Sequence, residues 1–180
     1  SIEEVRKLMR AEIQEKNTLL LKVRDLFLFS CFTGLRYSDV MDLKFENIKT
    51  NPDLIKIKMN KTGREIKIPL TTNAKEIIER YSKCLIKTPG TKLLPYVTNQ
   101  VLHRALKDLI QVAGIKKDIS FHCARHSFAS NLLQNKTSVV YVKDLLGHSK
   151  IGDTMIYCRS LETDLFTSME SLQDVYTLAG

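Results

Sequence analysis

The chain has 180 residues, of which 43% are hydrophobic, with only seven glycines and four prolines. This composition excludes a disordered chain and is sufficient for one sizeable core, so a single folded domain over residues 1–180 is expected. The formal net charge of +8 and the pI near 9.3 favour a polyanionic partner such as nucleic acid, although a lysine-rich solvated surface gives similar totals.

Cysteine spacing and hydropathy bear on where the protein works. The cysteines at 31, 84, 123 and 158 are scattered and form no C-x-x-C pair. They are predicted to be reduced thiols of a cytosolic protein rather than a disulfide framework or a zinc site. No apolar run has the length of a membrane span, and the start of the chain does not resemble a signal peptide. Because the sequence does not begin with Met, we expect a fragment of a longer protein.

Two helices are predicted at the start of the chain. Ser1 and Glu4 form a capping-box pattern that opens a charged helix through about residue 15. Residues 21–34 are apolar on nearly every side in their second half and end at Gly34. This pattern indicates a buried core helix that a glycine terminates.

A short helix and a β-hairpin are predicted next. Ser38 is placed to cap a helix that begins soon after Arg36. Apolar and polar residues then alternate with period two over 54–59 and again over 65–69, which is typical of strands. Because Asn60-Lys61-Thr-Gly63 separates the two runs, we expect an antiparallel hairpin with Lys61 at its turn or strand end.

Helical spacing then returns and continues to the end of the chain. Helices are predicted at about 73–86, 98–112, 121–134, 138–146, 151–158 and 161–177, with a Pro/Gly loop at 88–95. No internal repeat or linker to a second domain interrupts this pattern.

Residues of the types that phosphoryl transfer on DNA requires occur in order along these elements: Arg36, Lys61, His122, Arg125, His148 and Tyr157. Guanidinium groups match the charge that builds on the oxygens of a displaced phosphodiester, and a phenol is a nucleophile able to form a covalent phosphoester. No paired carboxylate of the kind that holds Mg²⁺ in two-metal nucleases accompanies them. The set therefore predicts metal-free covalent chemistry without a cofactor.

Several of these residues also have ordinary interpretations. His122 and Arg125 share a helix face that is commonly plain surface, and a lone Tyr157 is typical of packing. His122 and His126 have the spacing of a metal pair, but the Glu of H-E-x-x-H is missing and Arg125 lies beside them, which disfavours a metal. A different interpretation is a non-catalytic helix-turn-helix DNA-binding regulator that reads DNA through residues 138–158.

The ordered set resembles the tyrosine recombinases, the family that includes phage and transposon integrases. Thr33-Gly-Leu-Arg36 is similar to the family's first-arginine box, Asn60-Lys61-Thr-Gly to its catalytic-lysine turn and His122-Cys-Ala-Arg125 to its H-x-x-R box. Leu146-Gly-His148-Ser is similar to the box of the later histidine, and Thr154-Met-Ile-Tyr157 to the nucleophile box. The resemblance covers about residues 1–170. It implies a single catalytic domain that is mainly α with a small antiparallel β-sheet (α+β), without the family's amino-terminal DNA-clamping domain.

The resemblance also implies a role for each residue. Tyr157 would attack the scissile phosphate and leave a 3′-phosphotyrosyl link and a free 5′-hydroxyl. Arg36 and Arg125 would clamp the non-bridging oxygens, and Lys61 would protonate the departing 5′-oxygen. The two histidines, His122 and His148, would supply further hydrogen bonds and handle protons.

Two further residues are expected to support this set. Asp39, about one turn from Arg36, is predicted either to hold that arginine in place or to be a solvated carboxylate. His126, one turn after His122, is expected to stand behind the catalytic residues.

The implied partners are double-stranded DNA and other recombinase protomers in a synaptic assembly, without a membrane. Residues 161–177 carry apolar side chains at helical intervals, and two interpretations stay open: docking on a neighbouring protomer, or packing on the chain's own core. A type IB topoisomerase would use the same strand chemistry to relax DNA. The expected location is the cytoplasm of a prokaryote, at the nucleoid.

Overall fold

The computed structural model describes residues 1–83 and 88–158. In chain order the helices are α1 (Ile2–Arg10), α2 (Thr18–Thr33), α3 (Tyr37–Asp42), α4 (Thr72–Ser82), α5 (Asn99–Val112), α6 (His122–Gln134), α7 (Val139–Leu146) and α8 (Gly152–Met155). Between α3 and α4 lie a 3-10 turn, Phe45–Asn47, and the strands β1 (Ile48–Thr50), β2 (Asp53–Lys58) and β3 (Glu65–Pro69). The helix predicted at 161–177 lies outside the described residues.

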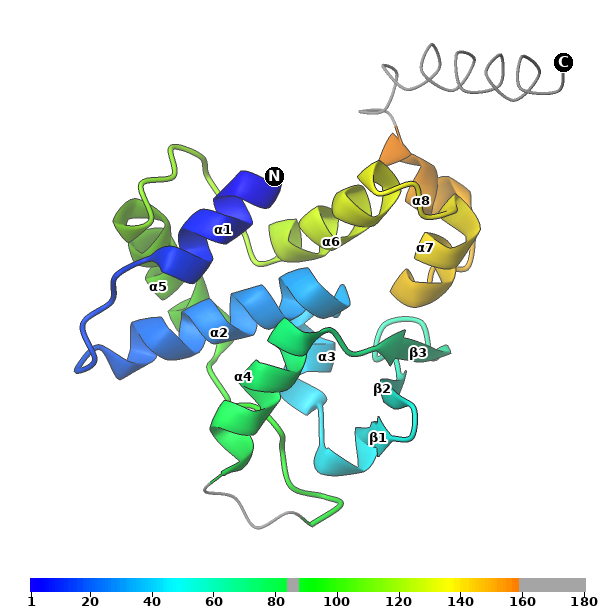
Figure 1. Ribbon diagram of the computed structural model, residues 1–180, viewed down its shortest axis with the longest axis horizontal. Coiled ribbons are helices and arrows are strands. Elements are labelled where there is room, and N and C mark those ends of the chain that lie inside the picture. Colours follow the sequence, from blue (N-terminus) through cyan, green and yellow to red (C-terminus); the bar gives the residue numbers. More distant parts are fainter. Residues whose placement is uncertain (84–87, 159–180) are drawn as a thin grey trace, which may run out of the picture.

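Helix α2 is the centre of the fold (Figure 1), where it contacts α1, α3, α4, α5 and α6. Its side chains are buried on several faces, which is why its sequence is apolar nearly all round. Gly34 ends α2 in the left-handed conformation, with φ at 70°. A Cβ at Gly34 would lie 2.5 Å from Cδ1 of Phe128 in α6. The predicted glycine stop is therefore confirmed, and it brings α6 against the residues just before Arg36.

The three strands form one antiparallel sheet in the order β1-β2-β3. Ile55 pairs with Ile68 and Ile57 with Ile66, so these four buried side chains lie on one face. The predicted hairpin is confirmed, and the N–H of Gly63 closes its turn by donating to the carbonyl of Met59 at 2.9 Å. Strand β1 was not predicted because three residues are too few to show an alternating pattern.

Three predicted boundaries are wrong. Helix α1 keeps its predicted capping box but ends at Arg10, since Ala11 turns to ψ of 123°. Helix α3 begins directly after Arg36 and receives no capping bond from Ser38. Helix α8 ends at Met155 rather than 158, so Tyr157 lies in the turn that follows it. A four-residue α8 is also too short for the reading helix that the helix-turn-helix interpretation requires.

The apolar side chains form a main core around α2 and a second cluster where α6 meets α7. The second cluster consists of Phe128, Ala129, Leu133, Val142, Leu146 and Tyr157. The second cluster fixes the segment that holds Tyr157 to the rest of the fold.

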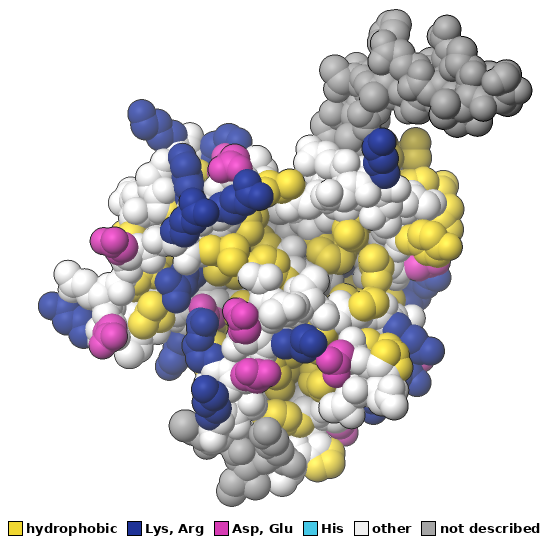
Figure 2. Space-filling model, in the orientation of Figure 1, with side chains coloured by type: hydrophobic (Ala, Val, Ile, Leu, Met, Phe, Trp, Pro, Cys, Tyr) yellow, Lys and Arg dark blue, Asp and Glu magenta, His cyan; other side chains and the backbone are white. Residues whose placement is uncertain are grey.

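On the surface, the face in Figure 2 carries many lysine and arginine side chains with acidic ones among them. No helix of the described residues combines the length and apolar character that a bilayer crossing needs.

Candidate active site

One cavity of about 480 Å³ brings together every residue predicted to be catalytic. Its lining includes Arg36 from the α2–α3 junction, Lys61 from the hairpin turn, His122 and Arg125 from α6, His148 from the turn after α7, and Tyr157 from the turn after α8. Thr62, Ser149 and Asp153, to which the sequence assigned no role, also line it. The shared cavity is an observation, whereas the catalytic role of each residue stays a prediction.

Arg125 is the most deeply buried charged side chain of the cavity, with 1% of its surface exposed. Its Nη1 donates to the carbonyl of Gly34 at 2.8 Å, and its Nη2 donates to the carbonyl of Leu146 at 2.5 Å. Burial, and to a smaller extent the charge of Arg36, lower the pKa of Arg125 to about 10, so it stays cationic at neutral pH. Arg125 therefore joins the segment before Arg36 to the end of α7.

Arg36 differs from Arg125 in how its donors are used. Its Nη1 is buried, and within the described part of the chain no hydrogen-bond acceptor reaches that atom. An unmade hydrogen bond of this kind costs roughly 1–3 kcal/mol. Because Arg36 lines the cavity, an anion bound there would supply the missing acceptor.

His148 is 8% exposed and is held from three sides. Its backbone N–H donates to the carbonyl of Lys143 at 3.0 Å, its Nδ1 lies 2.9 Å from Oγ1 of buried Thr154, and its carbonyl accepts from Nη1 of Arg64. Burial, then the charges of Arg125 and Arg36, lower the pKa of His148 to about 4. The imidazole is thus neutral at neutral pH, with Nε2 as the nitrogen left for the cavity.

Tyr157 is buried among these groups, with 6% of its surface exposed. Its ring is nearly parallel to that of His148, at a centroid distance of 6.4 Å, and it meets the ring of His126 at 5.1 Å. Burial raises the pKa of Tyr157, while the charge of Arg125 and a hydrogen bond from its side chain act in the opposite direction. The phenol is therefore protonated at neutral pH and must lose its proton when it attacks.

The two supporting residues have structural roles that the sequence did not define. Asp39 is fully buried, so the prediction of a solvated carboxylate is wrong. Its Oδ1 accepts a hydrogen bond from the backbone N–H of Asn60 at 2.8 Å, so Asp39 holds the turn that carries Lys61. Among the described residues, Asp39 forms no ion pair with Arg36. The ring centroid of His126 lies 4.6 Å from that of His122 and 5.1 Å from that of Tyr157, and its supporting role stays a prediction.

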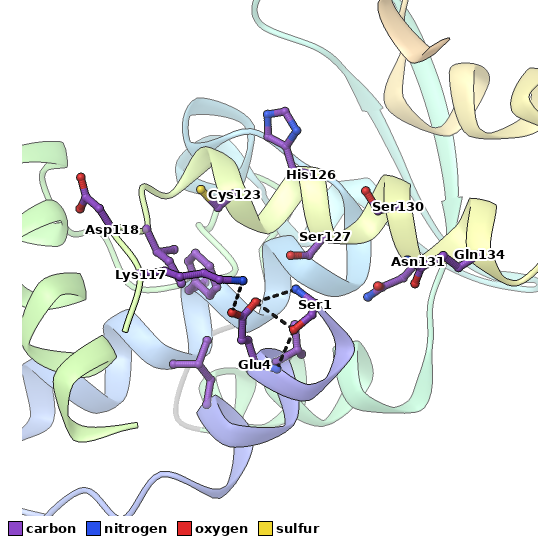
Figure 3. A pocket seen from close by; sticks show the side chains of 14 residues that line it. Ser1, Glu4, Lys117, Asp118, Cys123, His126, Ser127, Ser130, Asn131 and Gln134 are labelled. Carbon is purple, nitrogen blue, oxygen red and sulfur yellow. Dashed lines mark hydrogen bonds and ion pairs between the residues drawn. The ribbon is translucent and has the colours of Figure 1, made fainter. Parts of the chain in front are cut away.

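A second cavity, of about 370 Å³, lies between α1, residues 117–119 and α6 (Figure 3). His126 lines this cavity and contacts Tyr157, so it stands between the two spaces. Glu4 and Lys117 form an ion pair of 2.6 Å in the second cavity. No arginine is among the described residues that line it, so it lacks the donors that match a phosphate in the first cavity.

The contacts among the described histidines do not form a metal-binding site. No group of three or more His, Cys, Asp or Glu side chains within residues 1–83 and 88–158 is arranged to hold an ion. Burial lowers the pKa of His122 and of His126, and for each the charge of Arg125 acts in the same direction. Metal-free chemistry stays a prediction, which the experiments below test.

Acid is expected to destabilise the fold through His148. Its folded-state pKa of about 4 lies below the ordinary value of about 6.5, so as the pH falls the unfolded chain takes up this proton first. The contribution of His148 to the free energy of unfolding is fully present above about pH 6.5 and is lost as the pH falls towards 4. Between pH 7 and pH 5 the loss is about 2 kcal/mol. Urea unfolding at both pH values measures the loss.

His148→Gln tests whether His148 causes this pH effect. His103→Gln is the matched control, because it removes an exposed histidine of α5. His148→Gln should lower the pH-dependent loss by about 2 kcal/mol, and His103→Gln should leave it unchanged. If both variants lost as much stability as the unmodified protein, other groups would cause the acid sensitivity.

The sequence of this chain is similar to those of known proteins. Residues 2–163 match the phage integrase family. A tyrosine recombinase of Pseudothermotoga lettingae is 32% identical over 171 residues, which cover 92% of this chain and 60% of that protein. The tyrosine recombinase XerD of Lacticaseibacillus casei is 34% identical over 147 residues, which cover 76% of this chain and 50% of that protein. The chain thus spans only part of the length of these relatives.

Solved structures share the fold. The XerH site-specific recombinase bound to its palindromic difH substrate, a post-cleavage complex, matches 95% of this chain and 52% of that chain, with a TM-score of 0.73 and 21% identity. A lambda integrase dimer bound to a COC′ core site matches 86% of this chain and 56% of that chain, with a TM-score of 0.65 and 22% identity. The predicted fold class, mainly α with a small antiparallel sheet, is confirmed.

Proposed function

Because the chain belongs to the phage integrase family of tyrosine recombinases, we propose that it cuts and rejoins double-stranded DNA at specific sites through a 3′-phosphotyrosyl intermediate. The observation that carries the proposal is the single cavity in which Tyr157 meets Arg36 and Arg125. A phenol next to two guanidinium groups suits attack on a phosphodiester. The relatives described above are recombinases, which supports strand exchange over the relaxation of DNA by a topoisomerase.

The two arginines support the proposal by their electrostatics. The scissile phosphate gains charge on its non-bridging oxygens as the phenol adds, and donors that are already oriented stabilise that charge without reorganising. Arg125 is oriented by its bonds to two backbone carbonyls. Arg36 has a buried Nη1 without an acceptor among the described residues, and a phosphate oxygen would supply one.

Proton transfer from Tyr157 is assigned to the neighbouring histidines. His148 is neutral at neutral pH because of its low pKa, and in the tautomer whose Nδ1–H donates to Thr154 its Nε2 can accept a hydrogen bond or a proton. His122 reaches the same cavity from the first turn of α6. Reversal of the step by a second strand's 5′-hydroxyl conserves the bond energy, so rejoining needs no ATP.

Covalent trapping tests the function directly. A duplex with a nick close to the cleaved bond loses the short 5′-hydroxyl strand after attack, so the phosphotyrosyl adduct accumulates. We expect a protein–DNA band that resists denaturant and forms equally well in EDTA, because no step assigned here uses a metal. A protein that binds DNA but never forms this band would be a binding module. A strict requirement for Mg²⁺ would contradict the metal-free chemistry.

Lys61 is proposed to protonate the departing 5′-oxygen. The hairpin supplies four other cations, Lys56, Lys58, Arg64 and Lys67, but Lys61 is the one hairpin cation among the described residues that line the cavity. An alkoxide leaves poorly unless it gains a proton, whereas a thiolate leaves without that help because it is less basic. Lys61→Ala should cleave ordinary DNA slowly and cleave DNA with a bridging 5′-sulfur at nearly the unmodified rate.

The control for this rescue is Arg36→Ala, which should stay slow on the sulfur-substituted strand because its loss affects the non-bridging oxygens. Single-turnover rates on both substrates give the comparison. If sulfur did not restore Lys61→Ala, another group would be the general acid.

DNA binding by this chain is expected to be strongly salt-dependent. Its net charge of +8 would neutralise several phosphates and release their counterions, so the affinity should fall steeply as salt rises. Gel-shift titrations at about 50 and 200 mM salt measure the change, and we expect at least a tenfold weaker affinity at the higher concentration. An affinity that did not change with salt would contradict a phosphate-based contact.

Assembly and location complete the proposal. The lambda integrase neighbour is a dimer on DNA, which supports an assembly of this chain with further protomers. Residues 161–177, the proposed contact, lie outside the described residues. We further propose one catalytic domain and a cytoplasmic location at the nucleoid, where the DNA substrate is found.

A further inference from the structure

The turn that carries His148 packs directly on the hairpin that carries Lys61. Gly147 ends α7 with φ at 64°, and a Cβ at this position would lie 3.1 Å from Cγ2 of Ile66 and 3.4 Å from Cγ of Met59. Both neighbours belong to the hairpin, and β3 also contacts α7. Two elements far apart in the sequence are thus in close contact at Gly147.

Arg64 links the same two elements by hydrogen bonds. Its Nη1 donates to the backbone carbonyl of His148, and its own carbonyl accepts from the N–H of Met59 at 2.9 Å. Arg64 is half-buried and lines a surface hollow between β3 and α7 rather than the catalytic cavity. Its guanidinium is therefore directed to the protein backbone, and Arg64 does not line the catalytic cavity.

The bond from Arg64 is one of three that fix His148, together with the contacts to Lys143 and Thr154. The other two come from α7, just before the turn, and from α8, just after it, so both are local in sequence. Among the described residues, the bond from Arg64 is the one hydrogen bond that connects this turn to the hairpin, beside the packing of Gly147. Without it, the carbonyl of His148 would lose a charge-assisted donor, and the turn could move away from Lys61.

We propose that Arg64 is a positioning residue that fixes His148 relative to Lys61, so that both groups meet the same phosphate as one unit. The proposal rests on the recombinase function proposed above. It assigns Arg64 no contact with the reacting atoms. Small displacements of catalytic groups reduce rates by up to about 10²-fold, so Arg64→Ala should slow cleavage by roughly 10- to 100-fold at saturating DNA.

The first test measures single-turnover cleavage of the nicked duplex across a range of protein concentrations. Arg64→Ala should lower the rate constant at saturation and leave the half-saturating concentration nearly unchanged. Lys67→Ala is the matched control, because it removes an exposed cation from the same hairpin and should leave the saturated rate unchanged. A weaker affinity with an unchanged saturated rate in Arg64→Ala would make Arg64 a DNA contact and overturn the proposal.

The second test asks whether Arg64 acts through His148. In a His148→Ala background, Arg64→Ala should cause a much smaller further loss than in the unmodified protein, since the group that it positions is gone. Two independent, additive losses would contradict the proposal. Arg64→Lys, which keeps the charge and one donor, should recover part of the rate lost in Arg64→Ala.

The third test needs no cleavage and so separates this inference from the proposed function. NMR titration of the free protein should show His148 with a pKa of about 4, rising towards the ordinary value of about 6.5 in Arg64→Ala as the released ring meets water. Arg64→Lys should stay close to the unmodified value. An unchanged titration in a folded Arg64→Ala would overturn the proposal, whereas the absence of any covalent adduct from the unmodified protein would instead overturn the function.

Discussion

Tyr157→Phe is expected to abolish the covalent DNA adduct while leaving the fold and DNA binding intact. The substitution removes only the phenolic oxygen, which is the nucleophile in the proposed step. The ring stays in place because it packs with Phe128 and Leu146 in the cluster between α6 and α7. A denaturing gel with the nicked duplex should show no adduct, and gel shift should show an affinity within about twofold of the unmodified protein.

Tyr141→Phe is the matched control for this substitution. Tyr141 lies on α7 with 67% of its surface exposed, and it does not line the cavity. Its variant should form the adduct at the unmodified rate. If Tyr157→Phe still accumulated a denaturant-resistant band, Tyr157 would not be the nucleophile, and mapping the cross-linked peptide would identify the residue that is.

Arg36→Ala and Arg125→Ala should each slow cleavage by roughly 10²- to 10³-fold, the scale expected when a donor to the transition-state charge is lost. The two variants should differ in stability, although each removes one positive charge from the same cavity. Arg125 donates to the carbonyls of Gly34 and Leu146, which would be left buried without it. We expect Arg125→Ala to lower the free energy of unfolding by about 3 kcal/mol.

Arg36→Ala should leave the free energy of unfolding nearly unchanged or slightly higher. Its buried Nη1 has no hydrogen-bond partner among the described residues, so little is lost with it and a desolvation cost is removed. Urea unfolding of both variants, beside single-turnover cleavage, measures the pair. Equal stability losses would show that Arg36 is held by contacts like those of Arg125, and normal cleavage by either variant would remove that arginine from the site.

Much of the fold follows from local patterns in the sequence. The apolar run before Gly34 predicted the central helix, and the period-two alternation on both sides of Lys61 predicted the hairpin. Both signals depend on neighbouring residues alone, which is why they could be read without a structure. The predicted site residues were identified from side-chain types that suit one chemistry, from their order along the chain and from the resemblance of their motifs to those of the tyrosine recombinases.

The partners of each side chain depend on contacts between distant segments, which local patterns do not encode. Asp39 was expected beside Arg36, one helical turn away, but it bonds to the backbone of Asn60. The bonds of Arg125 and Arg64 to backbone carbonyls join segments that are remote in sequence.

The sequence by itself thus determined the elements, the chemical types and their order. Only the tertiary structure decided which guanidinium groups hold the protein and which one keeps a buried donor available for an anion. The physical reason is that buried polar groups must find hydrogen-bond partners, and the packing of α6, α7 and the hairpin determines which partners are within reach.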